Sequence, residues 1–305
     1  MRPRLLAIVG PTATGKSNAA ITAAEQLSAE IVSVDSMTVY RGMDVGTAKP
    51  SLEDRRRVPH HLFDVADPSE DFSVARYQEL ARSALPTIAS RGRATLLVGG
   101  TGLYFRAVVD DLAFPPTDPD VRGTLEREAE VVGVEAMHRR LAQLDPIAAG
   151  KIEHGNLRRT VRALEVAAVT GRPFSSFAED WEQFASDPVR VAGVDMEPAI
   201  LRARIETRVR TQLDSGLLEE TRRLLDAGPL SSTARQAIGY AEAIELVSGR
   251  ITLDEAAARI VRRSRHLARR QLSWFRRDPR IRWFHADERG AVSVIDEVIG
   301  YLRDG

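Results

Sequence analysis

A short apolar run, Leu5–Val9, is followed directly by the eight residues GPTATGKS at positions 10–17. These residues match the phosphate-loop pattern G-x-x-x-x-G-K-[ST] in full, and a helix is predicted after them. Glycines let the backbone turn around an oxyanion, and the N–H groups at the start of the helix point toward it. Lys16 adds a positive charge, and Ser17 offers a hydroxyl to Mg²⁺. The pattern therefore predicts a buried strand, a loop that binds a di- or triphosphate, and a helix.

The first hundred residues alternate strand and helix signals. We predict a helix from Ser17 to about Leu27, a short strand over 30–34, a helix over 77–90 and a third strand over 94–98. This order and spacing predict an α/β fold, with a parallel sheet flanked by crossover helices. The phosphate loop does not reveal what is bound, so a nucleotide kinase and an ATP-driven regulatory protein both remain open.

A proline-rich stretch at 115–119 ends this alternation, and residues 121–184 carry helix signals only. The clearest helix spans 157–169 and has Asn156 as its predicted N-cap. Its apolar face is predicted to consist of Leu157, Val161, Leu164 and Ala168.

The chain is predicted to return to the sheet after this helical stretch, through Ser186-Asp187-Pro188 and a strand over 189–194. The domains are then a phosphate-loop core of residues 1–118 and 186–305 and an all-helical insertion of residues 119–185. The C-terminal third is predicted to be helical, with an apolar stripe at 201, 205, 209 and 213, a helix over 236–247, and a long helix from Leu253 to about Phe275.

Composition excludes several kinds of site. The 305 residues include no cysteine, which rules out disulfides, Cys-based zinc sites, iron–sulfur clusters and a thiol nucleophile. No apolar run approaches the ~18 residues that a membrane-spanning helix needs. The start of the chain, Met1–Arg4 followed by Leu5–Val9, imitates a signal peptide, but its apolar stretch is shorter than the ~7–15 residues of such a peptide. We therefore expect a soluble, cytoplasmic protein without membrane contacts.

The net charge of zero hides an uneven distribution. Residues 259–282 contain ten arginines and one acid, Asp278, and so carry a net charge of +9. Unpaired charges at this density would repel one another unless a polyanion neutralised them, which favours a nucleic-acid partner over a solvated helix face. Lysine occurs only at Lys16, Lys49 and Lys151, so 40 of the 43 basic residues are arginine. We expect an ammonium to be specifically required where such a rare lysine occurs.

Two polar residues follow predicted strands at the edge of the sheet where ligands bind in open α/β folds. Asp35 follows the second strand, and Thr101 follows the third strand and the pair Gly99-Gly100. Asp35 has two interpretations of similar weight, a functional carboxylate that holds Mg²⁺ or acts as a general base, and the cap of an Asx-turn. Thr101 either presents its hydroxyl to a ligand or caps a glycine turn.

Seven motifs, in this order and spacing, resemble those of tRNA dimethylallyltransferases, and together they cover essentially the whole chain. The set is far more specific than any one motif. The motifs are GPTATGKS (10–17), DSMTVYRGMDVGTAKP (35–50), PHHLFDVADPSEDFSVARY (59–77), LLVGGTGLYF (96–105), NLRRTVRALEV (156–166), RQAIGY (235–240) and RRQLSWFRRD (269–278).

The resemblance implies a P-loop NTPase-like core that transfers a dimethylallyl group from its diphosphate to an exocyclic amine. The acceptor would be the adenosine on the 3′ side of the anticodon in tRNA. Asp35 would be the general base for this weakly nucleophilic amine. Mg²⁺ on Ser17 would stabilise the departing diphosphate. The diphosphate would be held by Gly10, Pro11, Thr12, Ala13, Thr14, Gly15, Lys16 and Ser17.

The resemblance gives two further residues a catalytic role. Thr101 would contact the bridging oxygen of the diphosphate, and Arg208 would be its partner there. From its place on a helix alone, Arg208 is more simply a solvated arginine, as we expect for most of Arg202, Arg204 and Arg210.

The acceptor adenosine lies in an RNA loop and must be turned out of its stack to reach such a crevice. The resemblance implies the anticodon stem-loop of tRNA and dimethylallyl diphosphate as partners of a monomeric enzyme. The implied tRNA contacts are Asp35, Ser36, Met37, Thr38, Thr101, Arg122, Arg158, Arg159, Arg162, Gln236, Gly239, Tyr240, Arg269, Arg270 and Gln271.

The chain departs from the family pattern at Thr38, where glutamine is usual, and at Ala241, where lysine is usual. Both departures concern RNA contacts. The absence of cysteine means that the zinc finger of eukaryotic relatives is missing. The adjacent pair His60-His61 lacks a third ligand, so we interpret it as structural. Alternatives are a prenyltransferase that acts on free adenine nucleotide, a small-molecule P-loop kinase, and a non-catalytic P-loop RNA-binding protein.

Overall fold

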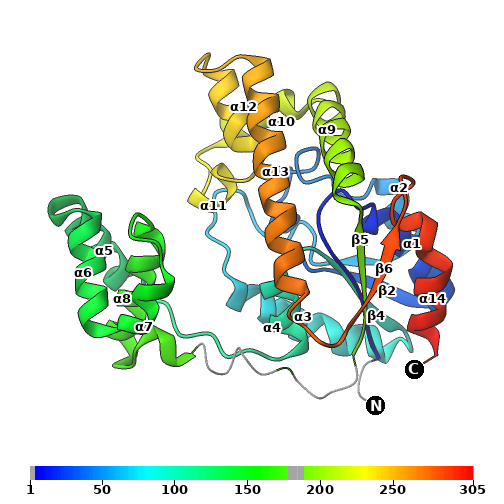
Figure 1. Cartoon of the computed structure of the whole chain (residues 1–305), viewed down its shortest axis with the longest axis horizontal. Coiled ribbons are helices and arrows are strands. Elements are labelled where there is room, and N and C mark those ends of the chain that lie inside the picture. Colours follow the sequence, from blue (N-terminus) through cyan, green and yellow to red (C-terminus); the bar gives the residue numbers. More distant parts are fainter. Residues whose placement is uncertain (1–3, 178–183, 185–188, 305) are drawn as a thin grey trace. The chain divides into compact units, whose positions relative to one another are not determined.

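The computed structural model describes residues 4–177, 184 and 189–304. The chain divides into two compact units, one of residues 1–109 and 186–305 and the other of residues 110–185 (Figure 1). The first boundary between the two units therefore lies before the proline-rich stretch at 115–119, whereas the sequence predicted it after residue 118. The predicted exit through Ser186-Asp187-Pro188 lies outside the described residues.

The larger unit is built on a six-stranded sheet in the order β3-β2-β4-β1-β5-β6, and all its strand pairs are parallel. The predicted parallel sheet is thus confirmed, as are three of its strands to within a residue. Helices cover both faces of the sheet, so its central strands are continuous apolar runs. The strands are β1 Leu5–Val9, β2 Ala29–Ser33, β3 His60–His61, β4 Ala94–Gly99, β5 Arg190–Met196 and β6 Ile281–Ala286.

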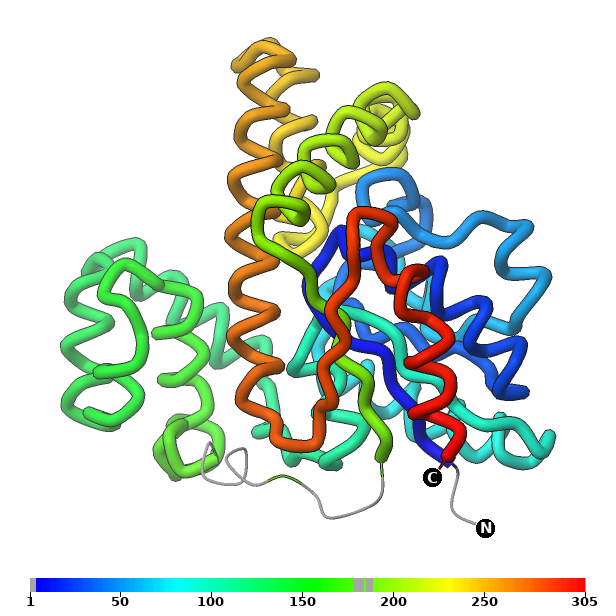
Figure 2. Tube along the Cα trace, turned by 45° about the vertical axis from the view of Figure 1, so that its right-hand side comes forward, coloured from blue at the N-terminus to red at the C-terminus, as the bar shows by residue number. Residues whose placement is uncertain are grey.

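Residues of β1 face alternate sides of the sheet and join two different cores. Leu6 and Ile8 pack with α1 (Lys16–Leu27) and α14 (Ile295–Arg303). Ala7 and Val9 belong to a second core, which takes in α3 (Val74–Ser90), α4 (Gly102–Val109) and α13 (Leu253–Phe275). Figures 1 and 2 show α1 and α14 together on one side of the strands. The phosphate loop therefore starts from a strand that is buried on both faces.

The long helix α13 has the bounds that the sequence predicted and packs against α9 (Pro198–Asp214), α12 (Tyr240–Val247) and α4 (Figure 1). The predicted helix over 236–247 is shorter at its start, because Gly239 has φ +95° and α12 begins after it. The C-terminal third is not wholly helical, since it contains β6, whose exposed polar positions obscured the strand. The smaller elements are α2 Leu52–Arg57, α10 Leu217–Ala227, α11 Ser232–Arg235 and the 3₁₀ turn η2 Ala291–Val294.

The regular elements among the described residues of the insertion unit are all helices, as predicted. Asn156 caps α8, because its side chain accepts a hydrogen bond from the N–H of Arg159. Leu164 is buried in the core of this unit, but Ala168, predicted on the same face, is exposed. The elements are α5 Pro119–Val132, α6 Val134–Leu144, α7 Pro146–Lys151, α8 Leu157–Thr170 and the 3₁₀ turn η1 Phe174–Phe177.

The rare lysine Lys49 is a buried structural residue. Its side chain is only 1% exposed, and its ammonium donates to Tyr40 O at 2.6 Å, Asp44 Oδ1 at 2.7 Å and Asp64 Oδ1 at 2.5 Å. Three acceptors around a compact ammonium suit its three N–H groups, whereas a guanidinium is planar and longer. The geometry is that of a site suited to an ammonium, and the requirement for it stays a prediction.

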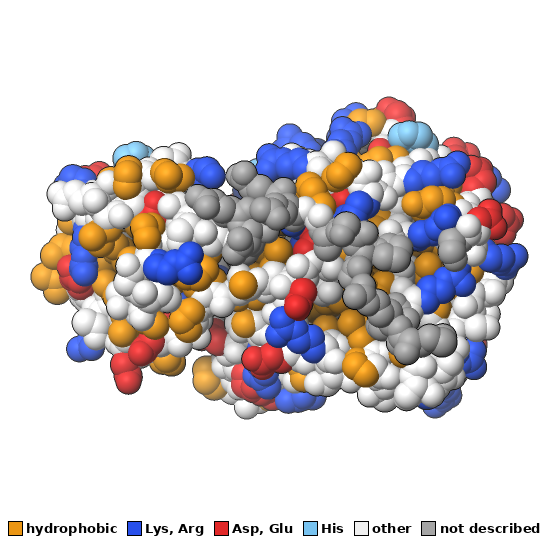
Figure 3. All heavy atoms as spheres, turned by 90° about the horizontal axis from the view of Figure 1, so that it is seen from below, with side chains coloured by type: hydrophobic (Ala, Val, Ile, Leu, Met, Phe, Trp, Pro, Cys, Tyr) orange, Lys and Arg blue, Asp and Glu red, His pale blue; other side chains and the backbone are white. Residues whose placement is uncertain are grey.

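The surface is mixed in character. Figure 3 shows acidic, basic and apolar side chains interspersed over the described parts of the face seen from below. Among the described residues, no helix has both the length and the apolar character needed to cross a membrane.

Candidate active site

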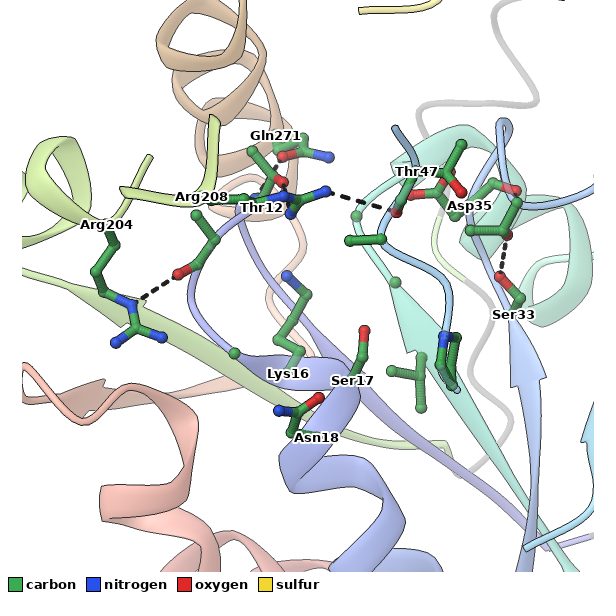
Figure 4. A pocket seen from close by; sticks show the side chains of 18 of the residues that line it. Thr12, Lys16, Ser17, Asn18, Ser33, Asp35, Thr47, Arg204, Arg208 and Gln271 are labelled. Carbon is green, nitrogen blue, oxygen red and sulfur yellow. Dashed lines mark hydrogen bonds between the residues drawn. The ribbon is translucent and has the colours of Figure 1, made fainter. Parts of the chain in front are cut away.

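A pocket of about 650 Å³ lies where β1, β2 and β4 end, at the carboxyl edge of the sheet (Figure 4). The phosphate loop forms one wall, and Asp35 and Thr38 after β2 form another. Gly99 and Gly100 contribute from the end of β4. The structure thus brings together the three strand ends that the sequence singled out, because neighbouring parallel strands end at one edge.

The phosphate loop has the backbone that its glycines predict. Gly10 has φ +141° and Gly15 has φ +87°. A Cβ on Gly10 would lie 2.2 Å from the carbonyl oxygen of Val194, so no other residue fits there without displacing β5. The helix α1 begins at Lys16, and its first N–H groups therefore point toward the pocket.

Lys16 is buried beneath the loop, where Nζ donates to Pro11 O at 2.5 Å and to Thr14 Oγ1 at 3.3 Å. Burial and, to a smaller extent, the charge of Arg208 lower the pKa of Lys16, the carboxylate of Asp35 opposes them, and the net result is a pKa of about 7. A bound anion would favour the charged ammonium again. The pocket therefore holds a cation that is costly to keep charged until a negative ligand arrives.

Two arginines one turn apart on α9 hold the phosphate loop. Arg208 Nη1 donates to Thr12 Oγ1 at 2.9 Å, and Arg204 Nε donates to Ala13 O at 2.9 Å (Figure 4). Arg208 lines the pocket rather than facing solvent. Arg202 and Arg210 are exposed, as expected for most of the three neighbouring arginines, and Arg204 is the exception. Burial lowers the pKa of Arg208, while the charge of Asp35 raises it. The four-residue spacing from Arg208 was the signal that could have found Arg204.

Asp35 forms the predicted Asx-turn and also lines the pocket. Its Oδ1 accepts the N–H of Met37 at 2.8 Å, which is an Asx-turn, and the same side chain lines the pocket. The hydroxyl of Thr101 accepts the N–H of Ser36 at 3.2 Å, so the two predicted segments are joined. Thr38 is buried and also lines the pocket, with its Oγ1 2.8 Å from Ser33 Oγ. The turn orients the carboxylate and leaves its second oxygen for a ligand.

Three predicted RNA contacts, Tyr240, Gly239 and Gln271, are buried. Tyr240 is fully buried, donates to Glu220 Oε1 at 2.5 Å and accepts the N–H of Gly46 at 3.2 Å. Its side chain therefore has a packing role, and the prediction that it contacts RNA is wrong for this conformation; the preceding Gly239 is buried as well. Gln271 lines the pocket, where its Oε1 accepts the N–H of Thr12 at 2.8 Å.

The arginine-rich segment, residues 259–282, has fewer unpaired charges than its sequence suggested. Several of its arginines form ion pairs with acids on other elements, which a count within the segment could not reveal. The argument that nine positive charges lack partners is therefore wrong. The pairs are Arg259–Glu245 at 2.8 Å, Arg263–Glu242 at 2.6 Å, Arg265–Glu206, Arg276–Asp195 at 3.5 Å and, within the segment, Arg280–Asp278 at 2.7 Å.

Exposed positions remain available for RNA on the larger unit. Arg269, Arg270 and Gln236, all predicted contacts, are exposed. Arg262 and Arg277 are exposed too and belong to the same segment. These cations present charge to solvent, as a phosphate backbone requires.

The predicted RNA contacts on the insertion unit fall into two groups, one exposed and one partly buried. Arg158 and Arg159 are exposed on α8. Arg162 donates to the carbonyl oxygens of Pro115 and Pro116, and Arg122 pairs with Glu165, which is fully buried, at 2.9 Å. Arg122 and Arg162 therefore also stabilise this unit.

A dedicated metal cluster is not part of the described structure. Among the described residues, no group of three or more His, Asp or Glu side chains could hold a metal ion. His61 Nε2 lies 2.7 Å from Glu30 Oε2, and His60 Nδ1 lies 2.7 Å from Val58 O, in agreement with a structural pair, although His60 also lines the pocket. Mg²⁺ commonly takes few protein ligands and completes its shell with water and phosphate oxygens. The exposed hydroxyl of Ser17 in the pocket fits such a site.

Comparison with known proteins agrees with this geometry. The family described as "IPP transferase" matches residues 38–278, and that described as "Isopentenyl transferase" matches residues 3–62. The tRNA dimethylallyltransferase of Moorella thermoacetica is 49% identical over 309 residues, with 98% of this chain and 94% of the relative covered. The tRNA isopentenylpyrophosphate transferase structure from Bacillus halodurans has a TM-score of 0.69 at 41% identity, with 99% and 97% covered. The chain therefore belongs to the IPP transferase family, alongside enzymes named tRNA dimethylallyltransferases.

Proposed function

We propose that the protein transfers a dimethylallyl group from dimethylallyl diphosphate to the exocyclic amine of the adenosine 3′ of the anticodon in tRNA, releasing diphosphate. One observation carries the proposal. The phosphate loop, a strand-end carboxylate and Arg208 line a single pocket that contains both a diphosphate cradle and a candidate base.

The cradle suits the departure of a diphosphate. The allylic carbon tolerates positive charge, so stabilising the leaving group is a large part of the task. Lys16, Arg208 and the N–H groups at the start of α1 surround the place where negative charge accumulates. Thr12 and Thr47 help to position Arg208, because its guanidinium donates to Thr12 Oγ1 and to Thr47 O.

Asp35 supplies the base in this proposal. The carbon–nitrogen bond forms at the adenine amine while the carbon–oxygen bond to the diphosphate breaks. The amine then loses a proton to the free oxygen of the Asp35 carboxylate. The bond from Met37 N–H to Oδ1 holds the carboxylate in place during this transfer.

Mg²⁺ would be held by Ser17 and by the diphosphate oxygens. When bound, the ion neutralises part of the charge of the diphosphate. The rest of the work falls to the residues of the chain, which bind and orient the two substrates.

The adenosine would enter the pocket from an unstacked RNA loop. Arg262, Arg269, Arg270 and Arg277 are proposed to bind phosphates, and Arg158 and Arg159 are proposed contacts on the insertion unit. We propose that the enzyme acts as a monomer, and a tRNA substrate supports a place in the cytoplasm.

The direct test is to incubate the protein with radiolabelled dimethylallyl diphosphate, Mg²⁺ and unmodified tRNA, with AMP and ATP as parallel acceptors. We expect label in tRNA only. Label in AMP but not in tRNA would identify the protein as a free-nucleotide prenyltransferase and would reject the proposal.

A further inference from the structure

Gln271 differs from its neighbours on α13. The residues before it, Arg269 and Arg270, are exposed, whereas Gln271 is 8% exposed and lies in the pocket. Its side chain reaches the phosphate loop beside Arg208 (Figure 4). An uncharged side chain from the arginine-rich helix therefore enters the diphosphate cradle.

The orientation of the Gln271 amide is determined by its partner. The N–H of Thr12 can only donate, so the atom 2.8 Å from it has to be the amide oxygen. The NH₂ group must then point away from Thr12. The oxygen and nitrogen of a glutamine amide are otherwise easily exchanged, and here the hydrogen-bond partner distinguishes them.

Gly100 makes room for this NH₂ group. A Cβ on Gly100 would lie 2.3 Å from Gln271 Nε2 and 3.2 Å from Gly10 O. The amide nitrogen thus sits between the end of β4 and the start of the phosphate loop. Both of its N–H groups are donors, and a ligand held by the loop supplies acceptors.

A neutral donor is well suited to this place. Lys16, Arg204 and Arg208 already lie beside the same loop, and a further cation would add to their mutual repulsion. An amide contributes hydrogen bonds to an oxyanion without adding charge. This reasoning separates Gln271 from the exposed arginines beside it.

We propose that Gln271 binds the diphosphate of the prenyl donor, with its carbonyl anchored on Thr12 and its NH₂ group donating to a diphosphate oxygen next to Arg208. The inference deepens the proposed function and rests on it. It also reassigns Gln271 from RNA contact to the donor pocket. Gln271 then links the helix that carries the proposed RNA contacts to the bound diphosphate.

The test measures binding of inorganic pyrophosphate with Mg²⁺ by isothermal titration, without tRNA. Gln271→Glu keeps an oxygen for the N–H of Thr12 but replaces both donors with negative charge. We expect its dissociation constant to rise about ten-fold or more, and that of Gln271→Ala to rise several-fold. Ser273→Glu, which adds the same charge at an exposed position of α13, is expected to bind as the wild type does.

The melting temperature of each variant is measured as well. Pyrophosphate affinities are compared among the variants that melt at the same temperature as the wild type. Equal binding by wild type, Gln271→Glu and Gln271→Ala would overturn the inference. So would weaker tRNA binding by Gln271→Glu with unchanged pyrophosphate binding, because this would return the residue to the RNA interface. A wild type that binds no pyrophosphate would instead reject the proposed function itself.

Discussion

Arg208 Nη1 donates to Thr12 Oγ1 at 2.9 Å, so a helix from the C-terminal half of the chain holds the phosphate loop from the first strand. Thr12 in the loop and Arg208 on the helix are 196 residues apart in the sequence. The same loop is held on its other side by Arg204, four residues earlier on α9.

Arg208→Lys tests this relationship. A lysine keeps the charge but cannot donate to Thr12 and to a diphosphate oxygen in the fork geometry of a guanidinium. We expect kcat to fall by about 100-fold, with a rise in the KM for dimethylallyl diphosphate. Steady-state kinetics would measure both, and Arg202→Lys, at an exposed position of α9, is the matched control. Wild-type kinetics for Arg208→Lys would remove its role.

Asp35→Asn tests the base. Asparagine can still accept the N–H of Met37, so the turn is retained, but it cannot take a proton from the amine. Turnover should fall by about 10²- to 10⁴-fold while tRNA binding stays close to wild type. Single-turnover assays and filter binding measure these quantities. Asp214→Asn, at an exposed position at the end of α9, serves as the control. Retained turnover would show that another group accepts the proton.

Lys16 predicts a pH dependence of diphosphate binding. Burial holds its pKa near 7 in the free protein, and a bound anion restores the protonated form. Binding should therefore take up a proton above about pH 7, and the affinity should fall as the pH rises through that value. Below it the lysine is already charged, so its contribution is constant.

The measurement for Lys16 compares pyrophosphate titrations of wild type and Lys16→Ala from pH 6 to pH 9. The ionisation of pyrophosphate itself affects both proteins, so the difference in slope belongs to the lysine. The stability of the folded protein depends on pH for the same reason. The unfolded chain holds the extra proton between about 7 and 10.5, so this lysine destabilises the free protein at low pH and the loss disappears as the pH rises through that window. Identical slopes of pyrophosphate affinity against pH in wild type and Lys16→Ala would contradict the binding prediction.

The exposed arginines predict the salt dependence of tRNA binding. Neutralising Arg262, Arg269, Arg270 and Arg277 together should lower the slope of log K against log salt by roughly three, since each single-strand phosphate contact contributes about 0.7. Filter binding at several salt concentrations measures this slope. Arg259 and Arg263 pair with Glu245 and Glu242, so their replacement should mainly lower the melting temperature. An unchanged slope in the fourfold variant would exclude this surface as the RNA site.

Lys49→Arg tests the structural ammonium. The guanidinium is too long and flat for the site between Tyr40 O, Asp44 and Asp64, and one partner would be left unpaired. We expect a loss of about 2–4 kcal/mol in the free energy of unfolding. Urea denaturation measures it, with Lys151→Arg at an exposed position as control. A stability equal to that of the control would show that the site accepts any cation.

The local features of the fold could be predicted from the sequence. The phosphate loop, the strands β1 and β4 and the bounds of α13 depend on neighbouring residues, on glycine conformations and on apolar spacing, all of which are visible along the chain. Asp35 was also visible, because it follows a buried strand.

Which charges are paired and which side chains reach the pocket depends on how the helices pack in the folded protein. Arg204 and Gln271 come from helices that pack beside the phosphate loop. The spacing from Arg208 indicates the contact of Arg204 only once Arg208 is placed in the pocket, and the residues around Gln271 do not indicate its contact at all. The acids that neutralise Arg263 and Arg265 lie on α12 and α9. Electrostatic and hydrogen-bond partners act through space over a few ångströms, so a charge counted along the chain does not reveal its neighbours in the fold.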